Sequence, residues 1–303
     1  PKGLVLLISV SLAAGVIRLA QKKILVQNIY ALETLAHVDT LCLDKTGTIT
    51  DGKLRVYSAV PMSLMPQRKA EALVKSYLAA CQDNNATFRA LQAWFGTEMF
   101  FQPVFRIPFS SKRKWGAISF REIGTVFVGA PEKLTDRLPK NLEQELEAGH
   151  RVVLIGYTRE NWEDAEELPG EIDPLYYVSL EDTVRPNARE TLDFFRQEGV
   201  DVKIISGDHA VTVSQTARQA GFSGWQKVAD LSLVGENADY DRLCQEYSVF
   251  ARVTPGQKQE LVKALKRQGH QVAMTGDGVN DLLALREADC SIAVADGSDA
   301  SRQ

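Results

Sequence analysis

The chain has 303 residues, a formal net charge of −4, 45% hydrophobic residues and 24% charged residues. This is ordinary globular composition with room for two domains, and it argues against a nucleic-acid-binding protein or a disordered tail. The cysteines form no Cys-x-x-Cys pair, which predicts buried thiols in a reducing compartment rather than disulfides or a zinc site. They are Cys42, Cys81, Cys244 and Cys290.

The first segment is an apolar run from Leu4 to Ile17 without a charged residue, followed by Arg18, Lys22 and Lys23. These fourteen residues are fewer than the about 20 that cross a bilayer. A basic cluster directly after an apolar run is typical of the cytoplasmic end of a membrane helix. For residues 1–27 we therefore predict the end of a transmembrane helix and its stalk; a buried helix of a soluble protein is the alternative.

A linker helix is expected over 27–36 and a buried strand over 38–43, which delivers Asp44 to its carboxyl end. Ligands bind at that edge of open α/β sheets. A carboxylate there can attack a phosphoryl group and form an acyl phosphate. Lys45 adds positive charge and Gly47 lets the backbone approach phosphate oxygens. A simple Asp-x-x-Gly turn is the alternative.

After residue 52 the pattern of apolar and polar residues changes. Residues 66–82 and 86–95 have helical periodicity, and three extended segments, 104–107, 115–121 and 125–128, predict an antiparallel meander. Helical segments at 132–137 and 139–148, an apolar run at 151–157 and an acidic loop at 160–170 follow. We predict an inserted α+β domain over residues 57–175.

From residue 176, strands alternate with helices. Strands are expected at 176–180, 202–205, 249–253, 272–274 and 291–294. Helices are expected from Pro186, as the first helical residue, to Gly199, and over 211–220 and 255–268. Repeated strand–helix order predicts a parallel sheet with helices on both faces, built from 28–56 and 176–303.

Three of these strands end near an acidic residue: Asp44, Asp208 after Ser206-Gly207, and Asp277 between two glycines. The carboxyl ends of parallel strands share one edge, so these carboxylates can converge. Bare like charges would repel, and a divalent cation removes the conflict. Mg²⁺ suits one or two carboxylates with phosphate oxygens.

The string DKTGTIT at 44–50 and the string GDGVND at 276–281 resemble motifs of P-type (E1–E2) ATPases, which sit in the haloacid-dehalogenase-like superfamily. The resemblance implies a Rossmann-type parallel sheet, the phosphorylation domain, interrupted by a nucleotide-binding domain with an antiparallel sheet. It implies that Mg²⁺ is held by the Asp44 side chain, the Thr46 carbonyl and Asp277. The residues implied to be catalytic are Asp44, Lys45, Thr46, Lys258, Asn280 and Asp281.

The same resemblance implies ATP-binding residues. Phe109-Ser110 with Arg113-Lys114 matches a family segment in which Phe109 would stack on adenine and Lys114 would contact the nucleotide. The other implied contacts are Gly129 of a Gly-Ala-Pro-Glu segment, Arg151 near the phosphates, hinge-side Arg185 and Arg252, and Ser206, Gly207 and Asp208 near the phosphoryl group. Two departures stand out: Val128 replaces a lysine, and Thr87-Phe88-Arg89 lacks the glutamate usually beside adenine.

The resemblance implies a bacterial pump of the calcium-type branch in the plasma membrane, with this portion, which includes the end of its fourth transmembrane helix, facing the cytoplasm. Its partners would be ATP, an inorganic cation and the actuator domain of the same full-length chain. Pro1-Lys2-Gly3-Leu4 is similar to the ion-binding Pro-Glu-Gly-Leu break of such pumps, with Lys2 in the carboxylate position.

Two other functions remain open. One is a soluble phosphatase with a cap domain, although such enzymes carry a second aspartate where Thr46 stands. The other is a nucleotide-binding module without catalysis. We expect the fragment alone to transport nothing and to hydrolyse ATP poorly.

Overall fold

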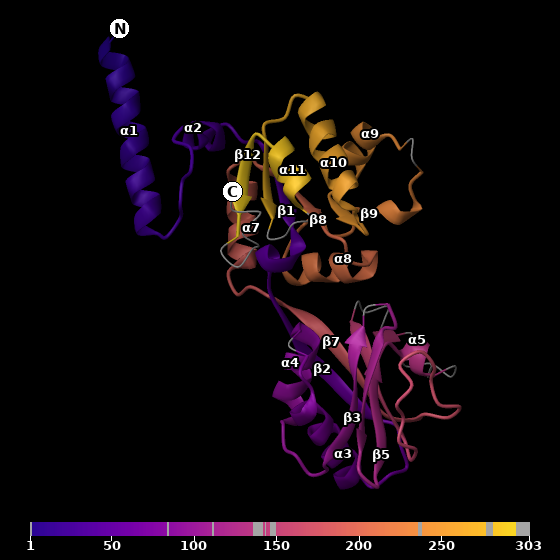
Figure 1. Ribbon diagram of the computed structural model, residues 1–303. Coiled ribbons are helices and arrows are strands. Elements are labelled where there is room, and N and C mark those ends of the chain that lie inside the picture. Colours follow the sequence, from indigo (N-terminus) through magenta and orange to yellow (C-terminus); the bar gives the residue numbers. More distant parts are fainter. Residues whose placement is uncertain are drawn as a thin grey trace. The chain divides into compact units, whose positions relative to one another are not determined.

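The computed structural model describes residues 2–83, 85–110, 112–135, 142, 144–145, 150–235, 238–276 and 281–294. The chain divides into two compact units (Figure 1): unit 1 comprises Pro1–Asp51 and Val184–Gln303, and unit 2 comprises Gly52–Thr183. The boundaries expected after residues 56 and 175 fall inside two long strands, β2 (Thr50–Pro61) and β7 (Asp173–Val184). The sequence alone did not reveal how far these strands extend.

Unit 1 contains a six-stranded sheet of order β12-β11-β1-β8-β10-β9, in which each strand runs parallel to its neighbours. The strands are β1 (Thr40–Asp44), β8 (Asp201–Ile205), β9 (Val228–Asp230), β10 (Val249–Ala251), β11 (Val272–Gly276) and β12 (Cys290–Ala293). The predicted parallel α/β sheet is therefore confirmed. The sequence did not single out β9 or the helices α9 and α11.

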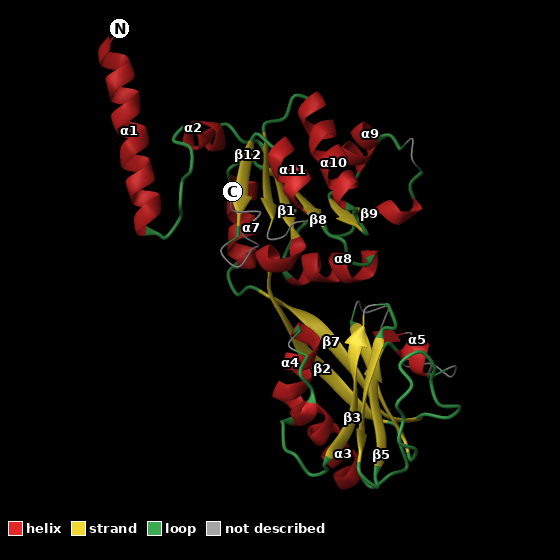
Figure 2. Cartoon of the chain, viewed as in Figure 1, coloured by secondary structure: helices red, strands yellow, loops and turns green. Residues whose placement is uncertain are grey.

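Helices cover both faces of this sheet (Figure 2). Successive residues of β1 face opposite cores: Leu41 and Leu43 pack with α7 and α8, whereas Cys42 packs with α9, α10 and α11. The helices are α7 (Ala188–Gln197), α8 (Ala210–Gln219), α9 (Tyr240–Glu246), α10 (Pro255–Arg267) and α11 (Leu282–Glu287). The burial of both faces explains why the strands read as continuous apolar runs.

Local signals set most helix ends, with one exception. Helix α10 begins with a capping box between Thr254 and Gln257, and Gly269, with φ 91°, follows its end. The prediction that Pro186 is the first helical residue is wrong, because α7 begins at Ala188 after Asn187. A proline can precede a helix as well as open it, so its position alone was ambiguous.

The N-terminal segment forms α1 (Lys2–Gln21), followed by a short α2 (Ala31–Ala36). Within α1, Gly3–Gln21 has a mean hydropathy of 2.2 and is long and apolar enough to cross a membrane. The prediction that the run is too short to span a bilayer is therefore corrected. The helix continues through Arg18, and a long basic side chain near a helix end can reach the interface.

Unit 2 is built on a six-stranded sheet of order β2-β7-β6-β5-β4-β3. Strands β3 (Pro103–Ser110), β4 (Trp115–Phe120) and β5 (Gly124–Gly129) form the predicted antiparallel meander, which continues antiparallel into β6 (Arg151–Thr158) and β7. Helices α3 (Gln67–Ala80) and α4 (Ala86–Phe95) match the predicted segments within a few residues.

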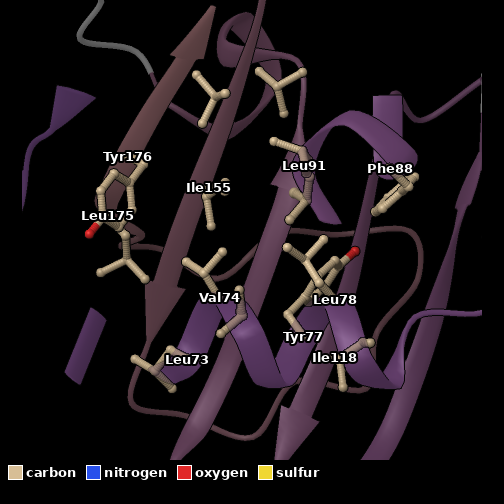
Figure 3. Close-up of a cluster of buried hydrophobic side chains, with 14 of the residues drawn as sticks. Leu73, Val74, Tyr77, Leu78, Phe88, Leu91, Ile118, Ile155, Leu175 and Tyr176 are labelled. Carbon is tan, nitrogen blue, oxygen red and sulfur yellow. The ribbon is translucent and has the colours of Figure 1, made fainter. Parts of the chain in front are cut away.

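The main core of unit 2 lies between these two helices and the sheet (Figure 3). From α3, Leu73, Val74 and Tyr77 point onto the sheet, where they meet residues such as Ile155 and Tyr176. A second core on the other face involves α5 (Pro131–Leu134) and the loop that carries Trp162. The helix predicted over 139–148 falls mostly outside the described residues.

Candidate active site at the end of strand β1

Asp44 is the last residue of β1, between β8 and β11 in the middle of the unit 1 sheet. It is 5% exposed. Its backbone N–H donates a hydrogen bond to Thr275 Oγ1 on β11 at 3.2 Å. The next five residues, Lys45–Ile49, form a turn whose backbone is not helical at Thr46 and Gly47, and Gly47 has φ 77°, which favours glycine. The carboxylate therefore lies at the carboxyl edge, as predicted for a parallel α/β sheet.

Lys258, in the first turn of α10, contacts Asp44 and Asp281 together. Its Nζ lies 2.8 Å from Asp44 Oδ1 and 2.5 Å from Asp281 Oδ1. All three side chains are less than 10% exposed. Burial disfavours the ammonium, but the two carboxylates outweigh this and hold the pKa of Lys258 above its ordinary value. Lys258 is thus a permanent cation beside Asp44.

Gly276 allows Asp281 to approach this site. A Cβ on Gly276 would lie 2.6 Å from the Cβ of Asp281 and 2.8 Å from its Oδ2, closer than real atoms pack. The glycine of the GDGVND string therefore has a steric role. Asp277 and Asn280, which the sequence assigned to metal binding and catalysis, lie outside the described residues, whereas Asp281 joins Lys258 and Asp44.

Lys45 and Asp208 form a second ion pair at this edge, with Nζ and Oδ2 2.7 Å apart. The Lys45 side chain is 1% exposed and that of Asp208 is 31% exposed. The Asp208 N–H donates to Ser206 Oγ at 3.1 Å, which fixes the turn after β8. A Cβ on Gly207 would have its nearest neighbour, Val253 O, at 3.8 Å. Asp44 and Asp208 thus lie at one edge, each with a lysine partner.

Arg185 holds the turn after Asp44. Its guanidinium donates to Gly47 O at 2.7 Å and to Thr48 O at 3.0 Å, and its backbone N–H donates to Ile49 O. Within unit 1, Arg185 therefore supports the turn's backbone, a role that the sequence did not suggest. The Thr46 side chain, in the same turn, is exposed.

Two further residues at this edge belong with the site. Thr275 was missed by the sequence reasoning, although it directly precedes the GDGVND string; its Oγ1 also lies 3.4 Å from Thr48 Oγ1. Arg252 has φ 51° and donates its N–H to Asp208 O at 2.8 Å. Its guanidinium lies 3.8 Å from Asp230, so it contacts a side chain of unit 1.

The residues that the sequence assigned to ATP binding in unit 2 gather at one end of its sheet. Ser110, at the end of β3, pairs with Trp115 at the start of β4, which pairs with Gly129 at the end of β5. Phe109 and Lys114 flank the first of these pairs. Arg151 begins β6 at the same end, since Gly129 pairs with Leu154.

Individual contacts in unit 2 refine these assignments. Phe109 is half-buried, and its ring meets Phe88 at 6.5 Å and 72°. Lys114 Nζ lies 3.3 Å from Glu132 Oε1 on the surface. A Cβ on Gly129 would lie 2.5 Å from Lys114 O, so glycine is needed for strand packing. Val128, where a lysine was expected, is a core residue.

Curated proteins with similar sequences cover the whole chain. The chain is 44% identical over its whole length to the probable cation-transporting ATPase exp7 of Streptococcus pneumoniae serotype 4 and covers 39% of it. It is 41% identical, again over its whole length, to the calcium-transporting ATPase CtpE of Mycobacterium bovis and covers 38% of it. The chain thus spans about two fifths of the length of these curated relatives.

A solved structure and a family model extend the comparison. The crystal structure of a zinc-transporting PIB-type ATPase in its E2·Pi state has a TM-score of 0.70 at 22% identity, covering 96% of this chain and 42% of that one. At that identity the match supports the fold alone. The model of the haloacid dehalogenase-like hydrolases matches residues 38–289, which include Asp44, Lys258 and Asp281. The chain therefore belongs to the haloacid dehalogenase-like hydrolase family.

Proposed function

We propose that this chain is the catalytic portion of a P-type cation-transporting ATPase, in which Asp44 accepts the γ-phosphoryl group of ATP. The observation that carries the proposal is the buried Asp44 carboxylate at the end of a central parallel strand, in contact with Lys258. The names of the relatives, which match along the whole chain, support the same assignment.

In this proposal an Asp44 oxygen bonds to the γ-phosphorus while the bond from that phosphorus to the β–γ bridging oxygen breaks, which releases ADP. Lys258, 2.8 Å from Asp44 Oδ1, offsets the charge on the transferred group. Asp281 holds the ammonium from the other side. The buried Lys45 adds a second positive charge next to the nucleophile in the chain.

The oxygen donors at the strand end are suited to Mg²⁺, a hard ion. The Asp44 carboxylate and the Thr46 carbonyl would hold it, together with Asp277 in the undescribed part of the motif. When bound, it would supply neutralisation of the phosphate oxygens during transfer. ATP would bind to unit 2 through Phe109, Lys114, Gly129 and Arg151, which share one end of the sheet.

Thr46 favours a pump over a soluble phosphatase with a cap domain. A threonine hydroxyl is a poor general base at neutral pH, so the acyl phosphate would persist long enough for a conformational change. The apolar helix α1 also suits a membrane protein. In the full-length protein we propose a multi-pass membrane location, with units 1 and 2 in the cytoplasm and an actuator domain on the same chain.

We propose an inorganic cation as the transported substrate, and calcium in particular. One observation supports calcium, namely the name of the Mycobacterium bovis relative. The Pro1-Lys2-Gly3-Leu4 segment does not, because the charged Lys2 stands in the position of the ion-binding carboxylate and cannot ligate a cation. ATPase activity of the full-length protein, measured across a panel of cations, tests this proposal. Stimulation by a cation other than Ca²⁺ would contradict the calcium assignment and leave the ATPase assignment intact.

The central test is covalent labelling of Asp44. The chain is incubated with γ-labelled ATP and Mg²⁺ and quenched in acid, and the label is expected on wild type but not on Asp44→Asn. Asp193→Asn, a surface aspartate of α7, is the matched control and should label normally. ATP binding without label would favour the nucleotide-binding module. Rapid turnover of small phosphate esters would favour the phosphatase.

A further inference from the structure

A carboxylate from a separate part of the chain is bound to the backbone of Phe109. Asp83, in the segment between α3 and α4, accepts a hydrogen bond at Oδ2 from the Phe109 N–H at 3.4 Å. The Phe109 ring is half-buried and meets Phe88 edge-on. An acidic group is therefore fixed beside the aromatic residue to which the proposed function assigns base stacking.

Two donors set the orientation of this carboxylate. Besides the Phe109 N–H, the Cys81 thiol donates to the same Oδ2 at 3.4 Å. Burial, with the charge of Asp83, raises the pKa of Cys81 to about 12, so the thiol remains a donor at neutral pH. Among the residues that the structure describes, Oδ1 has no hydrogen-bond partner. The partly exposed Asp83 thus offers one acceptor oxygen with a set direction.

The chemistry of this acceptor distinguishes nucleobases. A base stacked on an aromatic ring presents its polar edge to the groups around that ring. Adenine carries an exocyclic amine, whose N–H can donate a hydrogen bond to a carboxylate. Hypoxanthine carries a carbonyl at that position, and a carboxylate repels this oxygen. Phe88, which stands where related pumps have a glutamate, is 2% exposed within the core and cannot supply this acceptor.

We propose that Asp83 selects adenine by accepting a hydrogen bond from its exocyclic amine. This inference rests on the proposed function, in which unit 2 binds ATP with Phe109 as the stacking residue. It assigns base selection to Asp83, whereas the sequence motif places the carboxylate that contacts adenine at the position of Phe88.

Binding of ATP and of inosine triphosphate by the 303-residue chain, measured by calorimetry with EDTA present to prevent phosphoryl transfer, tests the proposal. Wild type should bind ATP about 10-fold more tightly than inosine triphosphate, because one hydrogen bond to a charged group contributes about that factor to affinity. In Asp83→Asn, the Phe109 N–H should hold the amide oxygen and turn the NH₂ group toward the base. The ATP preference should then fall about 10-fold or reverse.

Two controls complete the design. Glu163→Gln, an exposed acid in the loop on the opposite face of the sheet, should leave the ATP preference unchanged. Asp83→Ala should weaken ATP binding and, because the repulsion of the hypoxanthine carbonyl is removed, strengthen inosine triphosphate binding, which provides a second variant if the amide variant does not fold.

Failure of the inference and failure of the proposed function give different results. If Phe109→Ala weakens both nucleotides while the Asp83 variants change both in equal proportion, or if wild type has no preference, Asp83 does not select the base. If Phe109→Ala changes neither nucleotide, the proposed ATP site itself is wrong.

Discussion

Replacing Lys258 by methionine tests whether its ammonium stabilises the buried carboxylates of Asp44 and Asp281. At an effective dielectric constant of about 20, the 2.8 Å contact with Asp44 is worth roughly 6 kcal/mol before desolvation is subtracted. Removing one partner of a buried ion pair typically costs about 3–5 kcal/mol, because the charge left behind is uncompensated. We therefore expect Lys258→Met to lower the free energy of unfolding of unit 1 by about 3–5 kcal/mol at neutral pH.

The pH dependence of the same site has a defined sign. Its partners raise the pKa of Lys258, so its contribution is fully present below the pKa of an unfolded lysine, about 10.4. That contribution is lost as the pH rises through the higher pKa of the folded state. We therefore expect the difference in stability between wild type and Lys258→Met to shrink as the pH rises through the pKa of the folded lysine.

Hydrogen exchange measured by mass spectrometry is the suitable assay, because it separates the two units. Faster exchange should appear in β1, β8 and β11 of unit 1, with β4 and β5 of unit 2 as the internal control. The matched variant is Lys263→Met on the same helix, where the lysine pairs with Glu260 on the surface. Such pairs contribute about 0–1 kcal/mol. A cost for Lys258→Met below about 1 kcal/mol, or equal to that of Lys263→Met, would refute the reasoning.

Three further substitutions probe the sheet edge around Asp44, the proposed nucleophile. Thr275→Val removes the acceptor for the nucleophile's backbone N–H and should cost about 1–3 kcal/mol and slow phosphoenzyme formation; recovery of the labelling rate in Thr275→Ser checks that the hydroxyl is responsible. Gly276→Ala should cost about 1–3 kcal/mol in thermal unfolding through overlap with Asp281, whereas Gly170→Ala, with open space around it, should cost far less. Thr46→Asp introduces a general base and should shorten the phosphoenzyme lifetime in a chase with unlabelled ATP; an unchanged lifetime would contradict the role given to Thr46.

The parts of the fold that sequence predicts are those whose signal is local. The strand before Asp44 and the helix from Pro255 are marked by an apolar run and a capping box, and both were located within a few residues. Strand β2 was missed and β7 was shortened because polar and apolar residues do not follow a simple alternation along them. Their length is set by pairing within the sheet, which is not encoded in neighbouring residues.

The residues of the site also divide into those with a local sequence signal and those placed by long-range contacts. Asp44 and Lys258 were proposed from their motifs, since residue type and spacing are visible in the chain. The contacts of Arg185 with the turn after Asp44 join residues more than a hundred positions apart, and the bond from Asp44 N to Thr275 spans 231 positions. The pairing of β1 with β11 brings Asp44 next to Thr275, and the chain after β7 brings Arg185 to the turn. Asp83 beside Phe109 is a contact of the same kind.

The shared bonding of Lys258 has a consequence for the proposed reaction cycle. The ammonium contacts both Asp44 and Asp281, so it keeps a buried anionic partner when Asp44 becomes phosphorylated and its charge is redistributed. If the lysine were paired with Asp44 alone, each phosphorylation of Asp44 would change the only anionic group beside the buried ammonium. The ammonium would then be less well compensated in a desolvated site. Asp281 removes that dependence, and Gly276 makes room for Asp281. In the proposed cycle, Gly276 and Asp281 would thus support transfer through the placement of a carboxylate that need not itself touch ATP.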